Sequence, residues 1–285
     1  MQEHNSKTYI STKDFLVSGE SFSLLLDEER EMLITDPQPK ESELGAYYES
    51  SDYISHTDSK KGLLAFLYQN VKKRSLQKKA KLIKKLNRGS GSLLDIGAGT
   101  GEFCKVAQKS GWTSHGVEPN EKARAYSKSK GIDLNAAMEF YSGQEFDVVT
   151  LWHVLEHLPN LEESIHRISS LVRPGGTLVI AVPNFKSFDA KFYKSFWAAY
   201  DVPRHLWHFS KASMPILFAE NFELIKIKPM VFDSFYVSLL SEKYKSGNKF
   251  SIMAIFVGLW SNVYGWKTKE YSSHVYCFKK TRKKE

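Results

Sequence analysis

Between residues 92 and 182, short apolar runs alternate with segments of helical periodicity. The runs predict five strands, at Ser92–Ile96, Thr113–Val117, Ile132–Asn135, Phe146–Trp152 and Thr177–Val182. The intervening segments predict helices at Gly101–Ser110, Asn120–Lys130, near Leu155–Leu158 and at Leu161–Val172. Strands separated by helices of this length form β-α-β units with right-handed crossovers. We therefore expect an α/β, Rossmann-like doubly wound sheet that binds ligands at the carboxyl ends of its strands.

The pattern before this core is less regular. Residues 1–58 are predicted to form an N-terminal cap or extension, with short strands at Phe15–Val17 and Phe22–Leu26. Ser59–Arg88 contains eleven Lys or Arg residues and no acidic residue, and its apolar positions predict one long or two shorter amphipathic helices. The basic face is either a solvated face or a contact for nucleic acid or anionic lipid.

The chain after residue 182 is rich in aromatic residues, and we expect residues 183–285 to form a substrate-covering region with closing strands. Patterning predicts a helix at Ser210–Phe222 and strands at Glu223–Lys228 and Tyr271–Lys279. Ser251–Trp266 is apolar but too short to span a bilayer. It could dock on a membrane or a lipid-like substrate, or form a lid or dimer face; a helix packed on the domain is the favoured interpretation. Residues 59–285 are thus expected to form one domain.

A glycine turn follows the strand at Ser92–Ile96. Gly97, Gly99 and Gly101 occupy alternate positions, with Asp95 just before them, and Thr100 is predicted to cap the next helix. A strand, a glycine turn and a helix N-terminus together expose backbone N–H groups to an anionic ligand group. Glu118 stands 21 residues after Gly97, a spacing that suits a carboxylate accepting hydrogen bonds from a ribose diol.

This Asp-x-Gly-x-Gly-x-Gly stretch resembles motif I of class I S-adenosylmethionine-dependent methyltransferases, in the methyltransferase-23 and UbiG-like branch. Leu171–Gly176, ending in Pro-Gly-Gly before an apolar strand, is similar to the segment before strand five of that family. The resemblance covers about residues 90–185 and implies a mostly parallel sheet with an antiparallel C-terminal strand. It also implies the cofactor S-adenosyl-L-methionine, bound by Asp95, Gly97, Ala98, Gly99, Thr100, Gly101, Glu118, Pro119, Trp152 and His153.

Methyl transfer to a hydroxyl or amine can require a base that accepts the acceptor's proton. The candidates are His157, just past the fourth strand, and His205, with His208 near it in the substrate region. Each of these histidines could instead be a capping or packing residue. The Pro203–Leu206 segment is similar to one found in uncharacterised and polysaccharide-linked branches of the family.

The His153-x-x-Glu156-His157 pattern has a second interpretation, because inverted zinc peptidases use two histidines on one helical face with a glutamate base. Its position after a buried strand favours strand four of a methyltransferase. Some quinone-pathway relatives are thought to bind a divalent metal at the equivalent stretch. This chain has His153 where they tend to have an acid, so we predict no metal site.

The composition of the chain indicates which compartment and which partners to expect. Two cysteines, no signal-peptide pattern and no long apolar run suggest a cytoplasmic protein. We expect methyl transfer to a small-molecule, lipid-like or glycan acceptor, with peripheral membrane contact and oligomeric state left open. The formal charge of +8 keeps an RNA methyltransferase as an alternative. A nicotinamide-dependent oxidoreductase is disfavoured by the missing G-x-G-x-x-G spacing, and a zinc hydrolase by the strand context.

Overall fold

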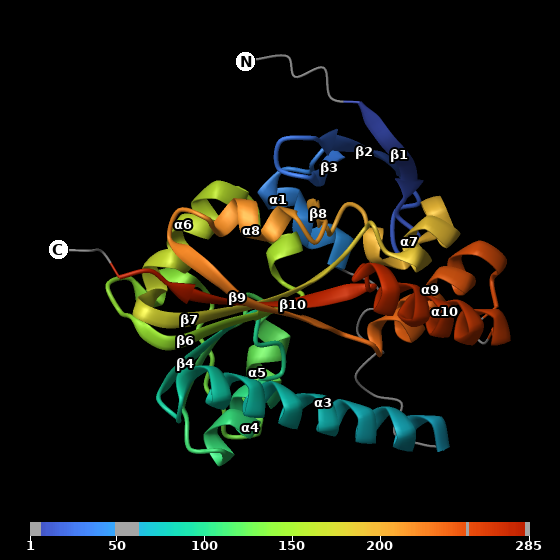
Figure 1. Cartoon of the computed structure of the whole chain (residues 1–285). Coiled ribbons are helices and arrows are strands. Elements are labelled where there is room, and N and C mark those ends of the chain that lie inside the picture. The colour runs from blue at the N-terminus through green and yellow to red at the C-terminus, as the bar shows by residue number, and fades with distance from the viewer. Residues whose placement is uncertain (1–6, 49–62, 249–250, 283–285) are drawn as a thin grey trace.

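The computed structural model describes residues 7–48, 63–248 and 251–282. Its centre is a six-stranded sheet in the order β5-β4-β6-β7-β10-β9, crossed by helices on both faces (Figure 1). β5, β4, β6 and β7 pair in parallel, and β10 is antiparallel to both of its neighbours. The bounds are Ser92–Ile96 (β4), Thr113–Val117 (β5), Phe146–Trp152 (β6), Val172–Pro183 (β7), Phe222–Pro229 (β9) and Ser273–Lys280 (β10). The predicted fold class is confirmed.

The two faces of this sheet are packed by different helices because successive strand residues point to opposite sides. Leu93 and Val148 lie in one apolar cluster with Ile83 of α3. Leu94 and Val149 lie in another with residues of the helices on the opposite face. α3 (Leu63–Asn87) and α4 (Glu102–Lys109) contribute to the first cluster, and α6 (Leu161–Leu171) and α8 (Ser213–Phe218) contribute to the second. The helix that follows β5 is α5 (Glu121–Ser129).

The structure confirms one of three further predicted elements, the long basic helix, and differs at the other two. The segment Ile132–Asn135 makes one parallel bridge, between Asn135 and Val117, and no named strand. The basic segment is a single long helix, α3, and the start of the prediction, residues 59–62, lies outside the described residues. A third prediction, a helix near Leu155–Leu158, is a short 3₁₀ turn, η3, at Leu155–His157.

A second, antiparallel sheet has the order β1-β2-β3-β8. Its strands are β1 (Thr8–Lys13), β2 (Ser21–Asp27), β3 (Met32–Asp36) and β8 (Trp207–Phe209). β8 therefore joins the N-terminal strands to the segment after the main sheet. The strand predicted at Phe22–Leu26 lies within β2, but the one predicted at Phe15–Val17 is wrong. That segment turns because the Asp14 carboxylate accepts hydrogen bonds from three following backbone N–H groups.

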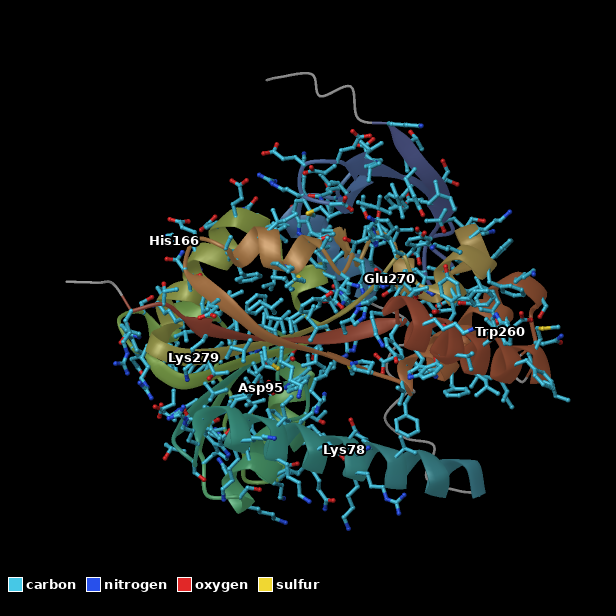
Figure 2. The ribbon with its side chains drawn as sticks, viewed as in Figure 1. Lys78, Asp95, His166, Trp260, Glu270 and Lys279 are labelled. Atoms are coloured by element: carbon cyan, nitrogen blue, oxygen red, sulfur yellow. The ribbon has the colours of Figure 1, made fainter. Side chains whose placement is uncertain are left out.

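The second sheet and several helices share one apolar cluster, which we call the covering layer core. It joins Leu24 and Leu33 of the sheet to Trp197, Val237 and Val257. The helical elements here are α1 (Glu41–Leu44), η1 (Gly45–Tyr48), α7 (Phe188–Tyr193), η4 (Lys194–Phe196), η5 (Ala198–Tyr200), α9 (Asp233–Ser246) and α10 (Ile252–Thr268). Across the described ranges, no helix combines the length and apolarity needed to cross a bilayer. Figure 2 shows Asp95 at the centre of the molecule and Trp260 at the end formed by α9 and α10.

Candidate functional site

The glycine turn after β4 is packed at both ends and open in the middle. Gly97, Gly99 and Gly101 all have positive φ, at 70°, 54° and 71°. A Cβ on Gly97 would lie 2.3 Å from Val154 Cγ2, and one on Gly101 would lie 2.2 Å from Ser127 Oγ. A Cβ on Gly99 would have no described atom within 4 Å. Glycine is thus required for packing at two positions, whereas the backbone of Gly99 faces free space.

The predicted cap of the following helix is wrong. α4 begins at Glu102 with Gly101 as its N-cap residue, and no side chain makes the capping hydrogen bond. Thr100 lies one residue too early for that position. Glu102, in the first turn, instead faces Lys72 of α3 at 2.6 Å and Lys130 at 3.6 Å. The turn therefore depends on backbone geometry rather than on a hydroxyl cap.

Two carboxylates lie at neighbouring strand ends. β4 and β5 are in parallel register, with Asp95 opposite Gly116, so Asp95 and Glu118 are at the same edge of the sheet. Glu118 Oε2 accepts the Gly99 N–H at 2.9 Å, and Oε1 accepts the Asn120 N–H at 2.9 Å. Each oxygen keeps a lone pair for a further donor. The two acids and the open middle of the turn thus lie along one acceptor-rich edge of the sheet.

Asp95 is the more buried of these two acids, with 2% of its surface exposed. Burial raises its pKa to about 7, opposed by the Thr150 Oγ1 hydroxyl, which donates to Asp95 Oδ1 at 2.6 Å, and by the charge of Lys79. The Lys79 ammonium from α3 lies 4.1 Å from the centre of the Trp152 ring. Trp152 Nε1 is buried without a hydrogen-bond partner among the described residues. An unpaired donor thus lies beside the acidic edge.

His153, just after β6, is held by two acids. Its φ is 58°, and its Nε2 lies 3.1 Å from Asp233 Oδ2 at the start of α9. Its Nδ1 lies 3.4 Å from Glu156 Oε1. Burial disfavours the charged ring, but the hydrogen bonds and charges of Asp233 and Glu156 outweigh it and raise the pKa of His153 to about 10. His153 is therefore a cation that ties the sheet edge to α9, and no sequence pattern pointed to Asp233.

His157, His205 and Glu156 form a compact group, which we call the Glu-His-His cluster. One ligand atom of each lies within 4.8 Å of the others, a separation at which the three could hold a metal ion. Glu156 Oε1 faces His153 Nδ1 at 3.4 Å, and Oε2 has no hydrogen-bond partner in the described part of the chain. His153 is not a member, because the motif lies on a three-residue 3₁₀ turn rather than on an α-helix. The helical face that a zinc peptidase would need is absent from this described segment.

Both histidines of the cluster have a fixed orientation. His157 Nδ1 lies 3.0 Å from the Arg204 carbonyl oxygen, and His205 Nδ1 lies 2.9 Å from that of Ala199. A carbonyl oxygen only accepts, so each Nδ1 carries a proton, and the Nε2 of an uncharged ring keeps a lone pair. Burial, together with the charge of His205, lowers the pKa of His157 to about 4. His157 is thus neutral near pH 7 and its Nε2 can accept a proton or hydrogen bond.

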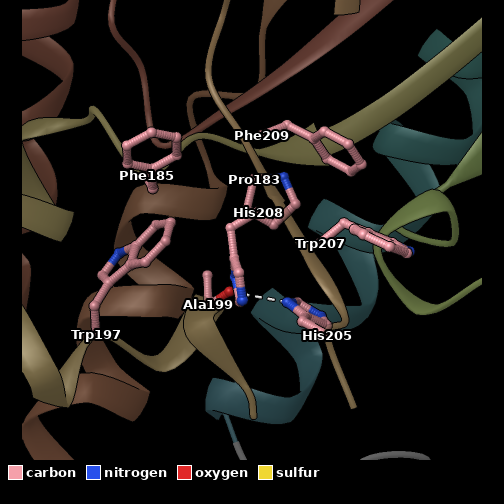
Figure 3. A pocket seen from close by; sticks show the side chains of 8 residues that line it. All are labelled: Pro183, Phe185, Trp197, Ala199, His205, Trp207, His208 and Phe209. Atoms are coloured by element: carbon pink, nitrogen blue, oxygen red, sulfur yellow. Dashed lines mark hydrogen bonds between the residues drawn. The ribbon is translucent and has the colours of Figure 1, made fainter. Parts of the chain in front are cut away.

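His205 also borders a narrow pocket beside the cluster (Figure 3). The pocket is too tight for a water molecule, and its lining is mainly aromatic. His208, on the same lining, has Nε2 2.9 Å from Thr35 Oγ1 of the N-terminal sheet. The other lining residues are Pro183, Phe185, Trp197, Ala199, Trp207 and Phe209. The aromatic stretch of the sequence therefore gathers around two predicted histidines.

The N-terminal region supplies site residues that sequence reasoning missed. The Tyr48 hydroxyl lies 3.0 Å from His157 Nδ1, and Thr35 also donates to the His205 carbonyl oxygen. Tyr48 is 109 positions from His157 in the chain, and Thr35 is 170 positions from His205. Local periodicity carries no information about such pairs. The aromatic content of the N-terminal region was the one available signal.

The chain matches a family model described as a methyltransferase domain over residues 51–226. It is 30% identical over 102 residues to a ubiquinone biosynthesis O-methyltransferase of Salmonella arizonae, covering 32% of this chain and 42% of that protein. It is 32% identical over 102 residues to the protein of the same name from Saccharophagus degradans, covering 32% and 43%. The match thus spans less than half the length of these relatives.

Solved structures share the fold. A 1,6-didemethyltoxoflavin-N1-methyltransferase of Burkholderia thailandensis, solved with its substrate and S-adenosylhomocysteine, aligns with a TM-score of 0.53 at 15% identity. The alignment covers 90% of this chain and 97% of that one. A putative sarcosine dimethylglycine methyltransferase of Galdieria sulphuraria aligns with a TM-score of 0.50 at 13% identity, covering 73% and 84%.

Proposed function

Since the chain belongs to the class I S-adenosylmethionine-dependent methyltransferase family, we propose that it transfers the methyl group of S-adenosyl-L-methionine to a small-molecule acceptor. The observation that carries the proposal is the acidic edge. Asp95 and Glu118 lie at adjacent carboxyl ends of parallel strands, on either side of a turn whose central glycine is open. Ligands of doubly wound sheets bind at this edge.

The residues at the edge fit this cofactor. The backbone of Gly97–Gly101 would lie against its methionine portion, where Gly99 leaves room that a side chain would fill. Glu118 would accept the ribose hydroxyls while keeping its bond to the Gly99 N–H, because each oxygen can accept twice. The unpaired Trp152 Nε1 offers a buried donor at the same edge. Pro119, Ala98 and Thr100 complete the proposed contact set.

When bound, the cofactor supplies an electrophilic methyl group on a sulfonium. The protein's part is chiefly to position the donor and acceptor in line, since no charge is created in the transfer. His153 is paired with Asp233 and Glu156, so it acts in this proposal as a fixed cation that holds α9 over the edge. Asp95, beside the turn, orients the polar end of the donor.

The acceptor's proton would be taken by the Glu-His-His cluster. His205 donates its Nδ1–H to Ala199, so Nε2 is available as base, and His157 packs edge-on to it with ring centroids 4.5 Å apart. The neighbouring Glu156 carboxylate would stabilise the imidazolium that forms. We propose His205 as the base and His157 as its partner.

The acceptor pocket is proposed to be the aromatic lining beside His205. Trp197, Phe185 and Phe209 present ring faces and edges. None of the eight lining residues is Asp, Glu, Lys or Arg. Such a lining favours an apolar or aromatic acceptor over a strongly charged metabolite. The pocket is too tight for a water molecule, so its lining must move apart by the volume of the acceptor before one can enter.

Cofactor binding tests the first part of the proposal. Titration of S-adenosylhomocysteine by calorimetry should give heat with the wild type. Glu118→Ala should weaken binding about 10- to 100-fold, because two hydrogen bonds to a charged acceptor are lost. Glu121→Ala, at an exposed acid on α5 three residues away, is the matched control and should bind like the wild type. Absence of heat with the wild type would refute the proposal.

A tritiated-methyl transfer assay against fractionated cell extract tests the second part. Labelling should appear in a small-molecule fraction. It should fall about 100- to 1000-fold with His205→Gln, because an amide side chain cannot accept a proton near neutral pH. S-adenosylhomocysteine affinity should not change. His166→Gln, at an exposed histidine of α6 (Figure 2), should label at the wild-type rate. Equal loss in both variants would rule out His205 as base.

A further inference from the structure

Helix α10 carries large apolar side chains on its solvent side. Phe256, Trp260 and Trp266 are 64%, 58% and 68% exposed. Five further residues of the same helix are exposed and apolar: Ile252, Met253, Ile255, Leu259 and Val263. Each of the eight has another of the set three or four positions away, so they lie on one side of the helix. A contiguous apolar face of this kind is uncommon on a soluble surface and marks a site of contact. We call these eight residues the α10 face.

The face is a consequence of how α10 packs. Its small residues are the buried ones: Ala254, Val257, Gly258, Ser261 and Gly265. A Cβ on Gly258 would lie 2.8 Å from the Phe235 ring of α9, so the two helices approach closely through their small residues. The large side chains have no room on that side and point outward. The exposed apolar face is therefore fixed by the helix pairing and not by a local misfit.

The exposed charges on α9 and α10 are basic, and Glu270, two residues after α10, is paired with Lys211. α10 has no acidic residue. Of the two acids of α9, Asp233 is paired with His153 and Glu242 is buried, with 8% of its surface exposed. The exposed charged residues of α9 and α10 are Lys245 and Lys267, and the exposed Lys269 directly follows the end of α10. Lys191 of α7 lies 5.7 Å from the Tyr264 ring, on the same rim. An apolar face with tryptophans and a lysine rim complements an anionic lipid surface.

From this combination we infer that the α10 face is a docking surface for a membrane containing anionic lipid, with α10 lying in the plane of the interface. The 17-residue helix would bury its apolar side chains among the acyl chains while the rim lysines contact headgroup phosphates. A second copy of the chain is the disfavoured occupant, because its own face would bring a like-charged lysine rim against this one.

Docking would also orient the rest of the molecule. α9 packs against α10, and Asp233 at the start of α9 contacts His153 at the sheet edge. Figure 2 shows Trp260 at one end of the molecule, with the lysine-rich α3 extending toward the same end. A bilayer in contact with the α10 face would thus lie beside α9, the helix that Asp233 links to His153 at the sheet edge.

Vesicle co-sedimentation tests the inference without cofactor or acceptor, so its failure is distinct from a failure of methyl transfer. The probe is a vesicle of about one part phosphatidylglycerol to three parts phosphatidylcholine. The wild type should sediment with it, and the Phe256→Glu, Trp260→Glu double variant should bind at least about tenfold more weakly, since each apolar side chain contributes roughly that factor. Lys267→Glu should lose roughly fivefold.

The matched control is Phe140→Glu. Phe140 is also 64% exposed but lies on η2 (Met138–Tyr141), remote in sequence from α10. It should bind vesicles like the wild type, and all variants should keep the wild-type melting temperature by circular dichroism. No sedimentation of the wild type, or equal binding by the double variant, would overturn the inference. A wild-type dimer that the double variant dissociates, without vesicle binding, would overturn it in favour of a second copy.

Discussion

The acidic edge of the six-stranded sheet and the covering layer above it are built from interactions of different range. At the edge, Gly99 donates to Glu118 across 19 positions, and both residues follow predictable strands. In the covering layer, Arg204 donates to Asp14 across 190 positions, and Thr35 contacts His208 across 173. The proposed cofactor side therefore follows from a local motif, whereas the proposed acceptor side exists only once two distant segments have folded together.

The two regions also differ in what stabilises them. The sheet edge rests on apolar clusters below it and on backbone geometry. The covering layer contains a buried ion pair, with the Arg204 and Asp14 side chains 1% and 0% exposed. Arg204 also contacts Asp201 at 2.7 Å and donates to the Tyr47 carbonyl oxygen at 3.0 Å. The covering layer should thus fail through loss of a charge partner, and the edge through steric change.

The largest expected effect is on the buried ion pair. Arg204→Met leaves Asp14 and Asp201 without their cation, and it should lower the free energy of unfolding by about 3–5 kcal/mol. Arg173→Met, at a pair with Asp147 in which the arginine is 42% exposed, should cost less than about 1 kcal/mol. Urea denaturation measures both. Equal losses would show that the covering layer does not depend on this pair.

The next effect is a pH dependence from the sheet edge. Burial raises the pKa of Asp95 to about 7 from 3.8, so the folded protein holds a proton that the unfolded chain has released. Stability should therefore fall as pH rises from about 4 to about 7, by up to about 4 kcal/mol. Asp95→Asn should remove this fall, as measured by urea unfolding across that range.

The control for this slope is Asp147, another acid of the sheet. Burial opposes ionisation there, but hydrogen bonds from Ser92 and the Arg173 pair outweigh it and lower the pKa of Asp147. Asp147→Asn should remove stability that is present above the unfolded pKa and lost as pH falls. If the stability of the Asp147→Asn variant, which keeps Asp95, were flat from pH 4 to 7, the Asp95 assignment would be contradicted.

A third, smaller effect separates the packed and open glycines of the turn. Gly97→Ala should lower stability by about 2–3 kcal/mol, because its Cβ would meet Val154 at 2.3 Å in a left-handed conformation. Gly99→Ala should cost only about 1 kcal/mol of strain, since its Cβ meets nothing. Gly99→Ala should instead weaken S-adenosylhomocysteine binding. Thermal unfolding and calorimetry on both variants would show whether the order reverses.

The smallest effect concerns the link between the two regions. Asp233→Asn removes a charge beside His153 and should shift its pKa from about 10 toward 6.5, as followed by NMR titration. The stabilisation by this pair is complete below pH 6.5 and lost as pH rises through about 10. The pair is partly exposed, so we expect about 1 kcal/mol. Asp133→Asn, at an exposed acid, is the control; an unchanged His153 pKa in Asp233→Asn would refute the link.

The sheet, and the placing of Asp95 and Glu118 at one edge of it, could be predicted from the sequence because both depend on local signals. β4, β5 and β6 follow the predicted bounds. β4 and β6 are nearly continuous apolar runs, as is usual for buried parallel strands, whereas β5 is apolar only at its end. β1 was missed because Thr8–Lys13 is mostly polar and largely exposed, and offers no such run. The partners of His157 and His153, Tyr48 and Asp233, could not be found, because they come from elements whose packing no periodicity specifies.

The position of α9 and α10 in the chain has a consequence for the sheet. They lie between β9 and β10, where Pro229 is paired directly with His274. The two ends of the segment are therefore neighbours on adjacent antiparallel strands, at a distance that a short turn could span. The hydrogen-bonded ladder closes in the same way for any length of chain between them. This junction can accept, enlarge or exchange a surface-binding module without altering the strand order of the methyltransferase sheet.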